Sequence, residues 1–277
     1  MSKPWLKISP TYGLLIPGEQ PATINVTVTI DNSTALLLNA GREVLEDILI
    51  LRLENGRDYY ITVRADYARS CYGMTIDELV MYADPIRSIP LDPIKRAEKY
   101  DINPTQALCI PKELWRLVDA VYEKGLQQPN LFFTPGNPEE VKQIRECLDT
   151  GAQFGTFSVH SYIDALTHFL SCLATPVVSP AIFPTVEINA ETIQSMTRRF
   201  LEDLPPIHYN VFVYIVSFLR EALAYKDRNN LTAAKLARIC VKHCSPTPNN
   251  VPLDNSSLQR RAGMQLIMLH MLETSSI

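Results

Sequence analysis

The chain has 277 residues, of which 46% are hydrophobic and 20% are charged, and its formal net charge is −4. This length suits one large or two ordinary domains, and the apolar content is enough for a packed core. The acidic balance argues against a general nucleic-acid binder, because phosphate backbones require a basic protein face. No apolar run reaches the roughly 18 residues that a membrane-spanning helix requires.

Residues 1–83 have the pattern of β-structure. Residues 24–30 alternate apolar and polar side chains, as a half-buried strand does, and residues 47–53 indicate a more buried strand. Residues 59–65 alternate again, and the preceding Asn55-Gly56 pair is typical of a hairpin turn, because both of its residues tolerate positive φ. These segments predict part of an antiparallel sandwich.

Residues 84–108 are expected to form a linker, because Pro85, Pro90, Pro93 and Pro104 interrupt any regular pairing. From residue 109 to residue 277 the periodicity is helical. The segment that starts at Ser158 has the clearest apolar face, formed by Tyr162, Ile163, Leu166, Phe169, Leu170 and Leu173. The pattern predicts an all-α domain of seven helices joined by short loops.

The six cysteines are scattered, and none forms a Cys-x-x-Cys pair. The best metal candidate is Cys240-x-x-His243-Cys244, which lacks the second pair of ligands that a closed zinc site needs. We therefore expect reduced thiols, and neither a metal nor a cofactor.

Residues 130–136 read Asn-Leu-Phe-Phe-Thr-Pro-Gly and lie between two helical patterns. They resemble the Gly-Ile-Phe-Arg-x-x-Gly loop that carries the arginine finger of Rho-GAP domains, with Leu131, Phe132 and Gly136 in matching positions. Residues 165–176 and 204–219 resemble two helices of the same family, in the family's order and spacing. The resemblance implies a Rho-GAP-like helical domain over residues 109–277.

The positions that support activity in that family differ here. The finger position holds Phe133, and a phenyl ring cannot supply the cation that stabilises a phosphoryl-transfer transition state. Thr167 and Ser171 replace a supporting Lys and Arg, while Lys235 and His243 occupy the family's late Asn-Leu-Ala and Pro-Asn-Leu positions. The resemblance thus implies that these five residues form a GTPase-facing surface without catalytic groups.

Residues 8–19 resemble the ASH and major-sperm-protein group of immunoglobulin-like domains, which carry an x-Pro-x-x-Gly-x-Leu-x-Pro-Gly-Glu segment before an alternating strand. The resemblance continues through residues 46–51, 55–59 and 70–73. It implies a partial immunoglobulin-like β-sandwich over residues 1–83, in which the opening strands are expected to be missing.

An ASH domain followed by a degenerate Rho-GAP domain is the C-terminal arrangement of the OCRL and type II inositol polyphosphate 5-phosphatase family, which residues 111–115 and 145–150 also resemble. The resemblance implies a non-catalytic interaction module in small-GTPase signalling and endocytic membrane traffic. Expected partners are Rho-family and Rab GTPases and endocytic adaptors with Phe/His peptide motifs, with no nucleic acid. The expected location is the cytoplasm, with peripheral association to endosome or Golgi membranes through these partners.

Trp115 lies at the rim of a helical apolar stripe, beside Val118 and Tyr122. Core packing and peptide binding are about equally good explanations, since aromatic residues at a rim also form grooves for short peptides. In the resembled family this region receives the Phe/His motif, so these three residues are the expected peptide-binding set.

Two alternatives remain open. The first is a working Rho GTPase activator with an unusual finger, although Arg145 and Lys142 are poor substitutes because both lie within the following helix. The second is a fragment of an inositol polyphosphate 5-phosphatase, acting in phosphatidylinositol dephosphorylation, whose own role is localisation. The phosphatase domain itself has no counterpart in these residues, so we expect no enzymatic activity.

Overall fold

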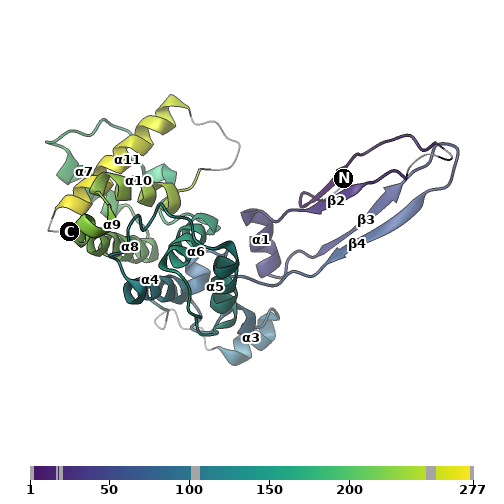
Figure 1. The fold of residues 1–277 in the computed structure, drawn as a ribbon, viewed down its shortest axis with the longest axis horizontal. Helices are drawn as coiled ribbons and strands as arrows, with labels where there is room; N and C mark the ends of the chain where they lie inside the picture. Colours follow the sequence, from purple (N-terminus) through teal and green to yellow (C-terminus); the bar gives the residue numbers. More distant parts are fainter. Residues whose placement is uncertain (1–2, 17, 19–20, 101–106, 248–253, 275–277) are drawn as a thin grey trace. The chain divides into compact units, whose positions relative to one another are not determined.

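The chain forms two compact units, Met1–Arg69 and Ser70–Ile277. The computed structural model describes residues 3–16, 18, 21–100, 107–247 and 254–274 (Figure 1). The boundary between the units differs from the one expected at residue 83. The reason is that Cys71 and Tyr72 are buried in the core of the second unit.

Two small antiparallel sheets make up most of the first unit. In one, β1 (Leu6–Ser9) pairs with β2 (Asn25–Val28), and in the other β3 (Leu45–Leu51) pairs with β4 (Tyr59–Ala65). The three strands predicted from the sequence are confirmed, with shifts of one or two residues at their ends. Their expected burial is not found, because β2 is exposed along its whole length and β3 is mostly exposed. β1 was not predicted, because a strand of four residues gives too little alternation to recognise.

A short helix, α1 (Asn32–Asn39), follows β2 and was also not predicted. It begins where Asp31 accepts a hydrogen bond from the backbone N–H of Thr34 at 2.7 Å, an ordinary N-cap. Among the described residues of this unit, one buried apolar cluster forms the core, and its members are Trp5, Leu6, Leu38 and Leu45.

The second unit is helical (Figure 1). The seven predicted helices are confirmed within its described residues, and their bounds are α4 (Lys112–Lys124), α5 (Pro138–Thr150), α6 (Val159–Cys172), α7 (Ile193–Glu202), α8 (Pro206–Ala224), α10 (Ala233–Cys244) and α11 (Asn255–Glu273). Shorter elements are α2 (Ile76–Val80), η1 (Ile86–Ser88), α3 (Pro93–Lys99), η3 (Pro180–Ile182) and α9 (Lys226–Asn229).

The segment expected to be a linker is residues 84–108, of which residues 101–106, with Pro104, lie outside the described part of the chain. Its described residues contain η1 and α3. Ile86 and Ile89 are buried in the core of the helical unit, and Pro93 occupies the first turn of α3 behind an Asp92 cap. Prolines at helix starts are compatible with ordered structure. This part of the chain therefore differs from a free linker.

The core of the helical unit lies where α4, α6, α8 and α10 meet. α6 packs against α4, α5 and α10, and α10 also packs against α8 and α11. The central apolar side chains of α8, including Phe212 and Val216, are fully buried. In the part of the chain that the structure describes, no helix combines the length and apolarity needed to cross a bilayer.

Candidate functional site

The loop of residues 130–136 forms a tight turn that directs Phe133 outward. Asn130 has a left-handed backbone, with φ 53°, and its carbonyl oxygen accepts hydrogen bonds from the N–H groups of Phe133 and Thr134 at 2.8 and 3.0 Å. Leu131 is completely buried, and the ring of Phe132 lies 6.4 Å from that of Phe218. Phe133 is 52% exposed, so it stands at the tip of the loop.

The end of the loop passes closely over the start of α6. The N–H of Gly136 donates to Asp164 Oδ2 at 2.7 Å, and the N–H of Asn137 donates to Ser161 Oγ at 3.0 Å. A Cβ atom on Gly136 would lie 2.5 Å from the Cα of Ser161, which is far inside the normal contact distance. Only glycine fits at this crossing.

Lys235, in the first turn of α10, lies against the finger position. Its Nζ is 5.3 Å from the centre of the Phe133 ring and donates to the carbonyl oxygen of Asn230 at 2.9 Å. The structure thus brings together two of the residues that the sequence predicted to face a GTPase.

Thr167, Ser171 and His243 form a second group, on α6 and α10. Ser171 Oγ donates to the carbonyl oxygen of Thr167 at 2.9 Å and lies 2.7 Å from His243 Nδ1. Burial, with a contribution from the nearby Lys242 charge, lowers the pKa of His243 to about 4. The imidazole is therefore neutral at neutral pH.

A small apolar hollow lies beside the second group, of which Thr167 and His243 contribute to its lining. Its volume is about 20 Å³, which is room for roughly one water molecule. Its lining residues come from α4, α6, α8, α10 and the loop of residues 130–136, which we call the finger loop. They are Val118, Phe132, Leu166, Thr167, Leu170, Ile215, Phe218, Leu219, Ile239, Cys240, His243 and Cys244. The residues that line it carry no Lys, Arg, Asp or Glu side chain.

The aromatic rim on α4 is exposed. Trp115 is 51% exposed, and Tyr122 is exposed while its ring packs edge-on against Phe218 at 5.8 Å. Val118 is only 1% exposed and lines the apolar hollow. Of the three residues expected to bind peptide, Trp115 and Tyr122 are therefore accessible at the surface, whereas Val118 lies beneath it.

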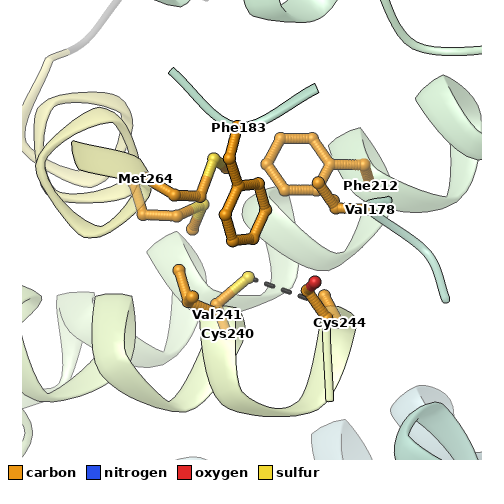
Figure 2. A pocket seen from close by; sticks show the side chains of 9 residues that line it. Val178, Phe183, Phe212, Cys240, Val241, Cys244 and Met264 are labelled. Atoms are coloured by element: carbon orange, nitrogen blue, oxygen red, sulfur yellow. Dashed lines mark hydrogen bonds between the residues drawn. The ribbon is translucent and has the colours of Figure 1, made fainter. Parts of the chain in front are cut away.

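Cys240 and Cys244 lie on the buried side of α10 (Figure 2). Their Sγ atoms are 3.6 Å apart and face a hollow too small to admit a water molecule, beside Phe183 and Met264. Among the described residues no cluster of three or more His, Cys, Asp or Glu side chains could hold a metal ion.

Asn229 was not among the residues predicted to form this site, yet it is fully buried beside the loop. Its Nδ2 donates to the carbonyl oxygens of Leu126 and Ala222 at 2.9 and 2.7 Å, and its Oδ1 accepts from the N–H of Leu231 at 3.0 Å. The adjacent pair Asn229-Asn230 could have indicated a helix end at this point of the sequence, because asparagine is enriched at left-handed helix ends. Asn230 does have a left-handed backbone there, with φ 61°.

Comparison with known proteins assigns a family to each part. Residues 1–67 match the model of the ASH domain of OCRL-like inositol polyphosphate 5-phosphatases, and residues 111–248 match that of the RhoGAP domain. The type II inositol 1,4,5-trisphosphate 5-phosphatase of Mus musculus is 34% identical over 248 residues, which are 86% of this chain and 24% of that protein. Rho GTPase-activating protein 24 of Rattus norvegicus is 29% identical over 140 residues, which are 47% of this chain and 19% of that protein.

A solved structure shares the fold of the helical part. The crystal structure of human Rho GTPase activating protein 15 superposes with a TM-score of 0.53 and 15% identity, covering 71% of this chain and 91% of that one. In contrast, this chain spans at most about a quarter of the two curated relatives described above.

Proposed function

Because this chain joins an OCRL-like ASH domain to a RhoGAP domain, we propose that it is a non-catalytic module that binds small GTPases. The observation that carries the proposal is Phe133 at the tip of the loop where an arginine finger would stand. The proposed GTPase-facing surface also includes Thr167, Ser171, Lys235 and His243. Rho-family GTPases are the proposed first class of partner, and Rab GTPases the second.

The absence of catalysis follows from the chemistry of the surface. An arginine finger contributes roughly 10³–10⁵ to the rate by placing a cation against the charge of the transition state. Phe133 has no charge, Thr167 and Ser171 donate to backbone carbonyls of their own helix, and His243 is neutral. The one cation, Lys235, lies beside the Phe133 ring with its ammonium bonded to the carbonyl oxygen of Asn230, and it does not occupy the finger position itself. Apolar packing and polar contacts can still bind a partner without these groups.

Single-turnover GTP hydrolysis with a panel of Rho-family GTPases tests this proposal. We expect the native chain to accelerate hydrolysis less than about 10²-fold, which is below the contribution of a finger. The variant Phe133→Arg serves as a comparison, because it restores only the finger. Acceleration above that limit by the native chain would instead establish the alternative of a working activator.

We also propose that the exposed rim of Trp115 and Tyr122 binds the Phe/His motif of endocytic adaptors, with Val118 supporting it. The exposure of Trp115 favours this role, because an indole with half of its surface in water is not primarily a core residue. Through such partners the chain would associate with endosome or Golgi membranes.

Titration calorimetry with a Phe/His motif peptide tests the peptide site. Trp115→Ala should weaken binding by about 2 kcal/mol, as the loss of an aromatic hot spot does. Tyr209→Ala is the matched control, because Tyr209 is an exposed aromatic residue on another helix, α8. Equal binding by Trp115→Ala and the native chain would exclude the rim, and unfolding of Trp115→Ala would assign Trp115 to the core.

A further inference from the structure

Hydrogen bonds to two asparagines, Asn130 and Asn230, fix the positions of both Phe133 and Lys235. Lys235 Nζ donates to the carbonyl oxygen of Asn230, and Asn230 Nδ2 donates to Asn130 Oδ1 at 3.4 Å. Asn130 in turn accepts the hydrogen bond from the N–H of Phe133 that closes the finger loop. The ammonium and the ring therefore belong to one connected set of contacts, which fixes their relative position before any partner binds.

Lys235 does not stabilise the helix on which it lies. It occupies the third position of α10, close to the positive end of the helix dipole, where acidic side chains are favoured and α10 has none. Among the residues that the structure describes, no carboxylate forms an ion pair with it. The positive charge of Lys235 is thus uncompensated within the described structure.

Lys235 is also the one charged side chain among the five residues of the proposed GTPase-facing surface. Thr167 and Ser171 are neutral hydroxyl groups that donate to backbone carbonyls, and His243 is a neutral ring hydrogen-bonded to Ser171. Phe133 covers one side of the ammonium with an aromatic face, which attracts a cation and keeps water from that side. Among these five residues, Lys235 is therefore the one that can attract an anionic group of a partner.

We propose that Lys235 is the specificity-determining residue of this surface, and that its ammonium binds an anionic oxygen of the GTPase while Phe133 holds it in place. The inference rests on the proposed GTPase-binding function. The anionic oxygen has two possible sources, the terminal phosphate of bound GTP and a carboxylate of the GTPase itself. Because the site is preorganised, the charge contributes to binding without the cost of ordering a long side chain.

The test is the affinity of the native chain and its variants for a Rho-family GTPase loaded either with a non-hydrolysable GTP analogue or with GDP. Lys235→Met keeps the length of the side chain and removes its charge, and we expect it to bind about tenfold more weakly. Lys235→Arg keeps the charge and should retain most of the affinity. Phe133→Leu should weaken binding less than Lys235→Met, because it removes the aromatic platform but not the cation.

Lys142→Met is the matched control for net charge. Lys142 lies on α5, its side chain is 78% exposed, and its contact with Glu139 is a loose one of 3.9 Å. We expect Lys142→Met to change the affinity for the GTPase less than about twofold, because it removes only an exposed charge. Melting temperatures of all variants should match that of the native chain, since both lysines are exposed.

The two nucleotide states distinguish the source of the anion. Loss of affinity by Lys235→Met confined to the GTP-analogue state assigns the contact to the terminal phosphate, and an equal loss in both states assigns it to a carboxylate. Equal binding by Lys235→Met and the native chain would overturn the inference. A loss of affinity in Lys142→Met as large as that in Lys235→Met would also overturn it. If the native chain binds no GTPase of the panel, the proposed function fails, and the inference fails with it.

Discussion

The backbone N–H of Asn130 donates to the carbonyl oxygen of Asn229 at 3.0 Å, which joins the finger loop to the turn before α10. Asn229 is fully buried, and its side chain uses both amide protons and its carbonyl oxygen in hydrogen bonds to the backbone. The finger loop and the first turn of α10 therefore depend on the same buried amide. The Asn229 amide thus joins the turn before α10 to Leu126, which lies 103 positions earlier in the sequence.

Replacing this amide should destabilise the helical unit. Asn229→Ala removes the side-chain partners of the Leu126 carbonyl oxygen and the Leu231 N–H, whereas the carbonyl oxygen of Ala222 keeps the N–H of Tyr225, and each buried orphaned group costs about 1–3 kcal/mol. We expect the free energy of unfolding in urea to fall by roughly 3 kcal/mol. Asn230→Gly is the control, because Asn230 is exposed and already left-handed. A loss below about 1 kcal/mol in Asn229→Ala would contradict this account.

Gly136→Ala should disturb the finger loop directly. The added methyl group would meet the backbone of Ser161 at 2.5 Å, and neither backbone can yield without breaking the hydrogen bond between Gly136 and Asp164. Overpacking of this kind costs about 1–3 kcal/mol, to be measured by chemical denaturation. Gly13→Ala provides the comparison, since nothing lies within 4 Å of the position that its Cβ would occupy. Equal stability of the two variants would refute the close crossing.

The sequence was a good guide to the helices and a poor guide to the contacts between them. Helical periodicity and caps such as Asn137 and Ser158 located the long helices, because both signals are local. The pairing of Lys235 with Phe133 and the burial of Asn229 depend on packing between distant segments, which no local pattern encodes. The ordered segment around Ile86 and Ile89 was missed because clustered prolines favour a linker when the burial of their neighbours is unknown.

His243 should make the helical unit sensitive to acid. Its pKa is about 4 in the folded chain, below its usual value of 6.5, mainly because burial disfavours the charged ring. Between pH 4 and pH 6.5 the ring is protonated in the unfolded chain but neutral in the folded chain. The contribution of His243 to the free energy of unfolding is therefore complete above about pH 6.5 and falls as the pH drops towards 4. Buried Glu113 has a raised pKa and acts in the opposite direction, so the effect of His243 must be isolated by substitution.

The measurement is the free energy of unfolding of the native chain and of His243→Gln at pH 7 and pH 5. The substitution keeps a side-chain donor for Ser171 but removes the titrating group. We expect the native chain to lose more stability than His243→Gln over this interval. Identical pH dependence in the two proteins would show that the ring is as easily protonated in the fold as in the unfolded chain.

The strands of the first unit should exchange their amide protons faster than the central helix of the second. The buried core of the first unit is four side chains, whereas the interior part of α8, around Val211 and Leu219, lies within the extensive core of the helical unit. Apolar side chains on both faces of the second sheet, such as Ile50 and Ile61, are exposed. Regions with few buried apolar contacts open at lower free energy and exchange sooner.

Hydrogen exchange followed by mass spectrometry tests this expectation on the whole chain. We expect protection in Asn25–Val28 to be lower than at Val211 and Leu219 by about 10²-fold or more. Trp5→Ala removes the largest side chain of the small core, so it should abolish the remaining protection in the strands, while the protection of α8 stays unchanged because the two units are separately compact. Protection of β2 equal to that of α8 in the native chain would show instead that the strands form a complete and stable domain.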